Sequence, residues 1–136
     1  MAGYSGTPLA KKLGITEGKR VAYPDAAPGF EELLGDLPVG VSVRSRLAGP
    51  LDVIVFFTRR RADLERRLPA LRRAMDPAAG LWIAWPKRAS GVDTDMTEDV
   101  ARELALANKL VDNKVCAIDE TWSGLRLVIR LRDRPE

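Results

Sequence analysis

Residues 87–95 of this 136-residue chain combine the side-chain types and spacing that best fit ligand-binding chemistry. Lys87 supplies a positive charge, while Ser90, Thr94 and the amide of Gly91 supply short polar donors. A helix is expected to begin just after this stretch, and the free amides at a helix start favour negative charge. The combination predicts a site for a small anionic or phosphate-bearing ligand.

A purely structural role explains the same residues equally well. Lys87 could pair with Asp93 or Asp95, which lie a few residues further along the chain. The Ser90-Gly91 step is typical of a turn. Both interpretations of the stretch therefore remain open at the level of sequence.

Histidine is absent from the chain, and the only cysteine is Cys116. The commonest general base near neutral pH, the commonest transition-metal ligand and any disulfide within one chain are therefore excluded. The acidic residues within 93–99 could bind a hard cation, but they lack the spacing of a calcium-binding loop. We expect no metal site, and Cys116, in the middle of an apolar strand, is expected to be a core residue.

The charge distribution argues against two classes of partner. The 22 basic and 19 acidic residues are interspersed, with a net charge of +3, whereas nucleic-acid-binding proteins usually segregate their basic residues on one face. No apolar stretch approaches the length that spans a bilayer, and the first residues have no signal-peptide core. We expect one cytoplasmic domain over residues 1–136, with residues 1–18 as a helical lead-in.

The elements that would position the candidate residues alternate between strand and helix. Two continuous apolar runs, 51–57 and 80–86, predict central strands buried on both faces. Shorter strands are expected within 19–24 and 40–47, and the half-polar pattern of the second predicts a sheet edge. Helices are expected over residues 7–15, 28–35, 61–76 and 97–111.

Three details of this pattern can be tested against a structure. Pro69 interrupts a helical leucine pattern and is expected to kink or split that helix. Leu33 is expected on the apolar side of its short helix. The last two strands, within 113–122 and 125–132, are expected to form a hairpin whose turn contains Ser123 and Gly124.

Together these elements predict a three-layer Rossmann-like α/β fold with a mostly parallel sheet of about six strands, closed by a C-terminal antiparallel hairpin. Ligands of such sheets bind beyond the carboxyl ends of the strands, where the strand order reverses. We expect this edge to gather the 87–95 stretch with candidate ligand-binding residues that follow other strands: Tyr23, Asp25, Arg59, Asp119 and Trp122.

The order of elements resembles the class I methyltransferase fold, and GITEGKRVAYP is similar to the helix, glycine turn and first strand of that fold. The resemblance implies binding of S-adenosylmethionine (SAM). Two motifs of those enzymes are absent from this chain. Tyr23 and Pro24 stand in the loop where glycines let the backbone approach the cofactor. Arg44 and Arg46 stand where an acidic residue holds the ribose hydroxyls.

Two further stretches, LWIAWPKRASGVDTDMTEDV and VDNKVCAIDETWSGLRLV, resemble a family of small bacterial proteins that share a domain of unknown function. That family pairs a strand ending in Pro-Lys with a W-S-G-x-R hairpin. The resemblance implies a Rossmann-like fold and a bacterial cytoplasmic setting. It implies no activity, so no catalytic residue is assigned.

The leading interpretation is a non-catalytic Rossmann-like module that binds a small anionic ligand or a protein partner, without a cofactor. The alternative is a degenerate or atypical SAM-dependent methyltransferase. A third expectation is the pairing of two copies through the edge strand within 40–47, because an exposed strand edge offers unpaired backbone groups.

Overall fold

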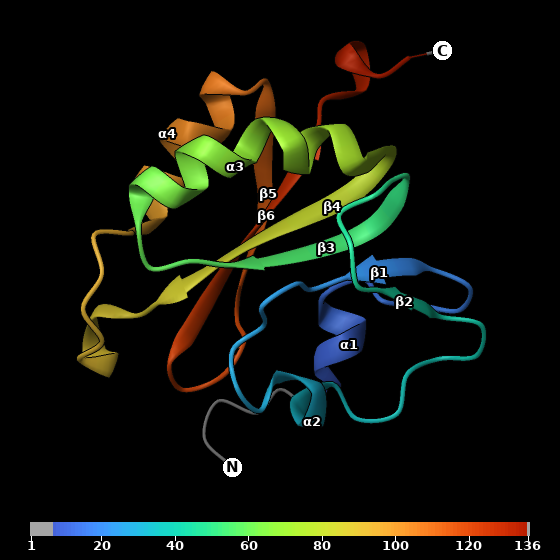
Figure 1. The fold of residues 1–136 in the computed structure, drawn as a ribbon, viewed down its shortest axis with the longest axis horizontal. Helices are drawn as coiled ribbons and strands as arrows, with labels where there is room; N and C mark the ends of the chain where they lie inside the picture. Colours follow the sequence, from blue (N-terminus) through green and yellow to red (C-terminus); the bar gives the residue numbers. More distant parts are fainter. Residues whose placement is uncertain (1–6, 136) are drawn as a thin grey trace.

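The computed structural model describes residues 7–135. The strands in this range are β1 (Arg20–Ala22), β2 (Ser42–Arg44), β3 (Leu51–Phe57), β4 (Met75–Pro86), β5 (Leu110–Ala117) and β6 (Trp122–Ile129). They form one six-stranded sheet in the order β2-β1-β3-β4-β6-β5 (Figure 1). Neighbouring strands from β2 to β4 pair in parallel, and β6 runs antiparallel to both β4 and β5. The predicted mostly parallel sheet with a terminal antiparallel hairpin is confirmed.

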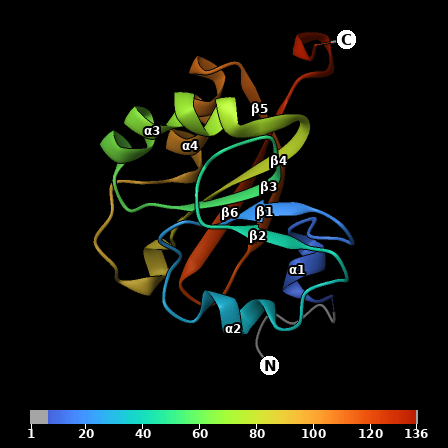
Figure 2. The same ribbon diagram turned by 45° about the vertical axis from the view of Figure 1, so that its right-hand side comes forward.

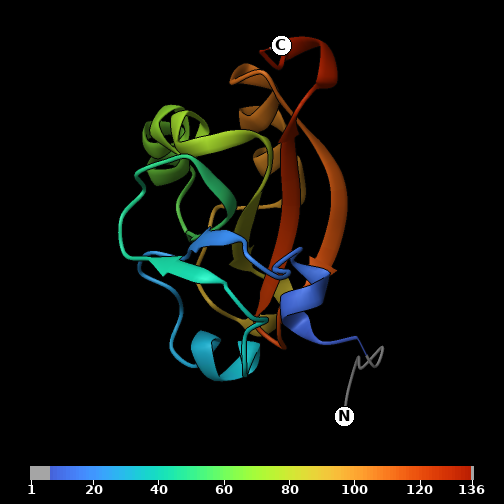
Figure 3. The same ribbon diagram turned by 90° about the vertical axis from the view of Figure 1, so that its right-hand side faces the viewer.

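Helices cover both faces of this sheet, which gives three layers. The helices are α1 (Leu9–Lys12), α2 (Phe30–Leu34), α3 (Arg61–Ala74) and α4 (Glu98–Ala107), with short 3-10 turns η1 (Arg88–Ser90) and η2 (Leu131–Asp133). Figure 1 and Figure 3 show α3 and α4 (green and orange) on one side of the sheet and α1 and α2 (blue and teal) on the other. None of the helices in the described range is long and apolar enough to cross a membrane.

The two central strands are apolar over residues 53–57 of β3 and 79–86 of β4 because both of their faces are buried there. Successive side chains of a strand point to opposite faces. In β4, Leu81, Ile83 and Trp85 pack in the core beneath α3 and α4. Trp82 and Ala84 pack in the second core, against α1 and α2. The run 51–57 therefore predicted β3 correctly, whereas β4 begins at Met75, five residues before the predicted run 80–86, and the helix expected to reach residue 76 ends at Ala74.

Helix α3 is continuous through Pro69, so the expected split is wrong. Leu64, Leu68 and Leu71 are fully buried on one side of the helix, whereas Pro69 is exposed on another. A proline inside a helix costs about 3 kcal/mol. Burial of each leucine contributes about 1.5–3 kcal/mol, so the buried leucine stripe outweighs the hydrogen bond that the proline removes.

The turn of the terminal hairpin lies at residues 118–121, and the expectation that Ser123 and Gly124 form it is wrong. Both residues belong to β6 and pair with β4 and β5. The turn is instead stabilised by Asp119, whose carboxylate accepts hydrogen bonds at 2.7 Å from the amides of Thr121 and Trp122. Gly124 lies within the strand because the Trp82 ring packs closely against it: a Cβ at this position would lie 3.1 Å from that ring.

Two smaller differences concern helix faces and ends. Leu33 is 46% exposed, because the short α2 buries only Phe30 and Leu34. Helix α4 ends at Ala107 rather than near residue 111. Its start is as expected, since the Thr97 hydroxyl accepts a hydrogen bond from the Val100 amide at 3.1 Å. Strand β2 lies at the sheet edge, as predicted (Figure 2).

Candidate functional site

The chain order reverses at β1, because β2 lies on one side of β1 and the next strand, β3, lies on its other side. Open α/β sheets bind ligands beyond the carboxyl ends of the strands at such a point. The loop that follows β1, residues 23–28, crosses this position. It forms a wall of two clefts, one toward β3 and one toward β2.

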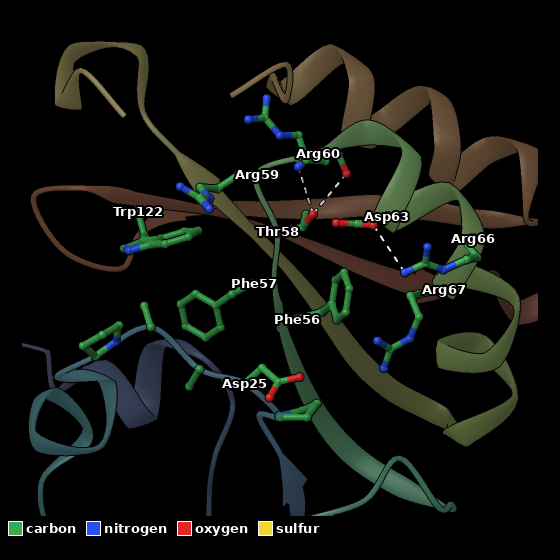
Figure 4. A pocket seen from close by; sticks show the side chains of 14 residues that line it. Asp25, Phe56, Phe57, Thr58, Arg59, Arg60, Asp63, Arg66, Arg67 and Trp122 are labelled. Atoms are coloured by element: carbon green, nitrogen blue, oxygen red, sulfur yellow. Dashed lines mark hydrogen bonds and ion pairs between the residues drawn. The ribbon is translucent and has the colours of Figure 1, made fainter. Parts of the chain in front are cut away.

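The first cleft has a volume of about 370 Å³ and lies between loop 23–28 and the amino end of α3. Its base is the carboxyl end of β3, with Phe57 and Trp122 on one side of the strand and Phe56 on the other, as Figure 4 shows. Its opposite wall is charged and consists of Arg59, Arg60, Asp63, Arg66 and Arg67. The cleft therefore combines an aromatic base with a mainly cationic side.

The second cleft has a volume of about 540 Å³ and lies between loop 23–28 and the carboxyl end of β2. Tyr23, Glu31 and Glu32 line the side of the loop and α2, and Arg44 lines the side of β2. Partial burial, and secondarily the negative charge of Glu31, raise the pKa of Tyr23. This cleft offers carboxylates where the first offers guanidinium groups.

Four aromatic rings connect the two clefts beneath the loop. Tyr23 packs edge-on against Phe30 with ring centroids 5.2 Å apart. Phe30 packs in the same way against Phe57 at 5.0 Å, and Phe57 against Trp122 at 5.1 Å. The ring of Tyr23 is therefore turned against the second core while it also lines the second cleft.

The backbone of loop 23–28 adopts the tight conformation that glycines usually provide. Asp25 has a φ of 54°, in the left-handed region that Asp and Asn tolerate better than most side chains. Gly29, with a φ of 87°, follows the loop, and a Cβ built there would meet nothing within 4 Å. The side chain of Asp25 is exposed and lines both clefts.

The charged wall of the first cleft is only partly neutralised. The guanidinium of Arg60 binds the carboxylate of Asp93 at 2.8 Å, and this hydrogen bond lowers the pKa of Asp93. Asp63 pairs with Arg66 at 3.3 Å. Arg67 lies over the ring of Phe56, 5.4 Å from its centroid.

The 87–95 stretch lies outside both clefts, and its polar side chains bond within the chain. The ammonium of Lys87 donates to the backbone oxygen of Asp119 at 2.8 Å, so Lys87 pairs with neither Asp93 nor Asp95. The Ser90 hydroxyl donates to the Lys87 oxygen at 2.6 Å.

Two other members of the stretch complete its connection to the strand end. The Thr94 hydroxyl donates to the backbone oxygen of Arg59 at 2.7 Å and accepts from the Met96 amide at 3.0 Å. Gly91, with a φ of 77°, ends the η1 turn. The stretch thus holds the end of β3 and the turn after β5 together.

The remaining predicted site residues gather where the sheet edge was expected to gather them. Arg59 and Trp122 line the first cleft, Tyr23 lines the second, and Asp25 lines both. Asp119 stabilises the turn that precedes Trp122. Within the described residues, no group of three or more acidic or cysteine side chains could hold a metal ion.

Sequence reasoning missed the cleft residues that belong to regular elements: Phe56, Asp63, Arg66, Arg67, Glu31 and Glu32. In the sequence, their types and spacing indicate core residues or solvent-exposed helix residues. A usable signal exists, because the first turns of a helix that follows a strand lie beside that strand's carboxyl end. Cys116, by contrast, packs half-buried against the second core as expected, and burial raises the pKa of its thiol.

No protein-family model matches the chain, and no curated protein matches it in sequence. Solved structures match its fold. A SAM-dependent methyltransferase from Aquifex aeolicus matches with a TM-score of 0.65 and 15% identity, over 90% of this chain and 88% of its own. Magnesium protoporphyrin IX methyltransferase from Synechocystis, with bound SAM, matches with a TM-score of 0.58 and 10% identity, over 90% of this chain and 74% of its own. SAM-bound fibrillarin from Aeropyrum pernix matches with a TM-score of 0.57 and 13% identity, over 88% of this chain and 73% of its own.

These likenesses show that the chain has a Rossmann-like fold of the methyltransferase type. They correct the leading interpretation of the sequence, a non-catalytic ligand- or partner-binding module, and favour its methyltransferase-like alternative. That interpretation gave the missing motifs more weight than the order of the elements. The resemblance to a small bacterial family gains no support, since no family model matches.

Proposed function

We propose that the chain is an atypical SAM-dependent methyltransferase whose cofactor lies across loop 23–28. One observation supports this above the others: two clefts flank the loop after β1, at the reversal point of a methyltransferase-type sheet. A ligand with a nucleoside at one end and an amino acid at the other would occupy the second cleft and reach across the loop to Asp25, at the border of the first cleft. The nucleoside would lie in the second cleft, beside β2.

The side chains of the clefts fit the polar groups of this cofactor. The second cleft lacks an acidic residue at the end of β2, where Arg44 stands, but Glu31 and Glu32 face it from α2 and can accept hydrogen bonds from ribose hydroxyls. Asp25, on the ridge between the clefts, offers a carboxylate to the ammonium group of the methionine part. The left-handed conformation of Asp25 gives the tight turn without a glycine-rich sequence.

The bound cofactor supplies a methyl group activated by its sulfonium. The task of this chain is to bind and orient both reactants and to exclude water from between them. The first cleft then receives the methyl acceptor, because it opens on the other side of Asp25. Its aromatic floor and charged wall would hold the acceptor in place.

Binding of S-adenosylhomocysteine (SAH), the demethylated cofactor, tests this function. A ligand at 100 times its Kd stabilises a protein by about 2.7 kcal/mol, which for a small domain raises Tm on the order of 10 °C. We expect such a rise in a thermal-shift titration. A flat Tm at millimolar SAH would refute the proposal.

Two variants locate the cofactor within the clefts. Asp25→Asn keeps a residue that tolerates the left-handed conformation and removes the charge, so SAH affinity should fall about tenfold, measured by calorimetry. Glu32→Gln should also weaken binding. Glu17→Gln is the matched control, because Glu17 is exposed and lines neither cleft.

A further inference from the structure

The arginines that surround the amino end of α3 fall into two groups. Arg60 pairs with Asp93, Arg61 with Glu103 and Arg66 with Asp63. Arg59 and Arg67 also line the first cleft, yet neither has a carboxylate within ion-pair distance among residues 7–135. Of the five arginines around the start of α3, the two that have no carboxylate partner thus both line the first cleft.

These two side chains lie on opposite sides of the carboxyl end of β3, because Phe56 packs in the core beneath α3 and α4 whereas Phe57 and Trp122 pack against the second core. Figure 4 shows Arg59 on the side of Trp122 and Arg67 on the side of Phe56. Arg67 is half-buried and packs over the Phe56 ring, 5.4 Å from its centroid. The first cleft spans both sides of this strand end, so a ligand that lies across it would bring its edge within reach of one guanidinium or both.

The base of the Arg59 side chain is held firmly. Its backbone oxygen accepts hydrogen bonds from the Thr94 hydroxyl at 2.7 Å and from the Asp95 amide at 3.3 Å. The preceding residue, Thr58, is buried and donates its amide to the Ala84 oxygen at 2.9 Å. Ligand binding at a fixed backbone loses less conformational entropy than binding at a mobile loop.

The helix itself disfavours cations at this position. The amino end of a helix carries a partial positive charge, so Arg59 and its neighbours at the start of α3 are repelled by it. The carboxylate of Asp95 already accepts a hydrogen bond from the Arg61 amide at this helix end, at 2.7 Å, so an anion in the cleft would be attracted mainly by the guanidinium groups. The electrostatics of the cleft therefore select the charge of its ligand.

We propose that the first cleft is an acceptor subsite for a planar, aromatic small molecule that carries a carboxylate or phosphate group. The ring would pack against Trp122, whose ring stands at 81° to that of Phe57, and the acidic group would extend over the end of β3 toward Arg59 and Arg67. The volume of about 370 Å³ is at the lower end of the range for small-molecule sites, which suits a ligand of this size. The identification as an acceptor subsite rests on the proposed methyltransferase function.

Trp122 provides a direct readout, because it is half-buried at the cleft while Trp82 and Trp85 are buried. Fluorescence titrations would use benzoate, phenyl phosphate, inorganic phosphate and benzamide, the neutral counterpart of benzoate. We expect benzoate or phenyl phosphate to bind about tenfold more tightly than benzamide or inorganic phosphate. Equal binding of benzoate and benzamide would overturn the role of charge, and equal binding of inorganic phosphate would overturn the role of the ring.

Matched variants assign the binding to the two arginines. Arg59→Gln and Arg67→Gln should each weaken benzoate binding about tenfold and leave benzamide binding unchanged. Arg73→Gln is the control, since Arg73 is exposed on the same helix and lies outside the cleft. Wild-type affinity for the aromatic anions in both cleft variants, with an unchanged Tm, would overturn the proposal.

SAH titrations of the same variants separate this inference from the proposed function. The acceptor subsite requires that Arg59→Gln and Arg67→Gln leave SAH affinity unchanged while Asp25→Asn lowers it. Loss of SAH affinity in the arginine variants would assign these side chains to the cofactor and overturn the inference. Binding of aromatic anions through the arginines without any SAH binding would keep the anion subsite and overturn the methyltransferase function.

Discussion

Replacing Trp82 with phenylalanine is expected to loosen the layer of helices that supports the loop between the two clefts. Trp82 is fully buried, and its indole nitrogen donates a hydrogen bond at 2.9 Å to the backbone oxygen of Leu13. Leu13 directly follows α1 and is itself fully buried. The bond therefore fixes the end of α1 to the centre of the sheet.

The magnitude follows from two losses. Trp82→Phe leaves the buried oxygen of Leu13 without its donor, which costs about 1–3 kcal/mol. Loss of part of the indole ring from a closely packed core adds about 1–2 kcal/mol. We expect the free energy of unfolding to fall by roughly 3 kcal/mol in total.

Trp85→Phe is the matched control. Trp85 lies on the same strand, is 6% exposed and packs in the opposite core, and its indole nitrogen has no hydrogen-bond partner among the described contacts. Its replacement should cause only the packing loss, about 1–2 kcal/mol. Urea unfolding followed by circular dichroism would measure both variants.

The difference between the two variants tests the reasoning. Trp82→Phe should be the less stable by about 1–2 kcal/mol, and hydrogen exchange should become faster in α1 and leave α4 unaffected. Equal stability of the two variants would refute the assigned role of the Leu13 hydrogen bond. Faster exchange throughout the chain would refute its localisation to the α1 layer.

Three further perturbations have defined outcomes. The carboxylate of Asp52 accepts hydrogen bonds from Arg20 at 2.8–3.0 Å, and the side-chain bond lowers the pKa of Asp52. A lowered pKa in the folded state stabilises the fold fully only at a pH above the unfolded-state pKa of ~3.9. Asp52→Asn should therefore lower the urea midpoint at pH 7. The gap should narrow as the pH falls toward the folded-state pKa, and a gap that stays as large at low pH as at pH 7 would contradict this. Thr97→Ala removes the cap of α4 and should lower the free energy of unfolding by about 1 kcal/mol, whereas Thr97→Ser should not. Gly124→Ala places a methyl group 3.1 Å from the Trp82 ring and should destabilise by about 1–3 kcal/mol, and unchanged thermal unfolding would show that the core yields at no cost.

The parts of the fold that the sequence predicts well are those where one physical effect dominates. The apolar runs of β3 and β4 allow hardly any alternative to a strand buried on both faces. The prediction of secondary structure failed where the same residues fit two different local structures. Ser123-Gly124 has the composition of a turn, yet Gly124 is required in the strand for the approach of Trp82, and Asp119 stabilises the turn instead.

The candidate site shows the same limit at the level of side chains. The rule for parallel sheets was sufficient to bring Asp25, Arg59 and Trp122 to one edge. It could not show that Lys87 bonds to a backbone oxygen on the neighbouring turn, because this depends on the exact position of the β5–β6 turn. Nor could it show that Tyr23 turns into the core, since its partner Phe30 is on another element.

The position of β6 in the sheet has a consequence for how the chain is synthesised. β6 is the final strand of the described range, but it lies between β4 and β5 in the interior of the sheet. A nascent chain that has reached only Ala117 therefore has β4, apolar on both faces, with an open edge on which no partner has yet formed. Such an edge is prone to aggregation, so we expect the growing chain to be most exposed to aggregation before β6 has paired with β4. Because Trp122 begins that strand, the floor of the first cleft is also completed only at this late stage.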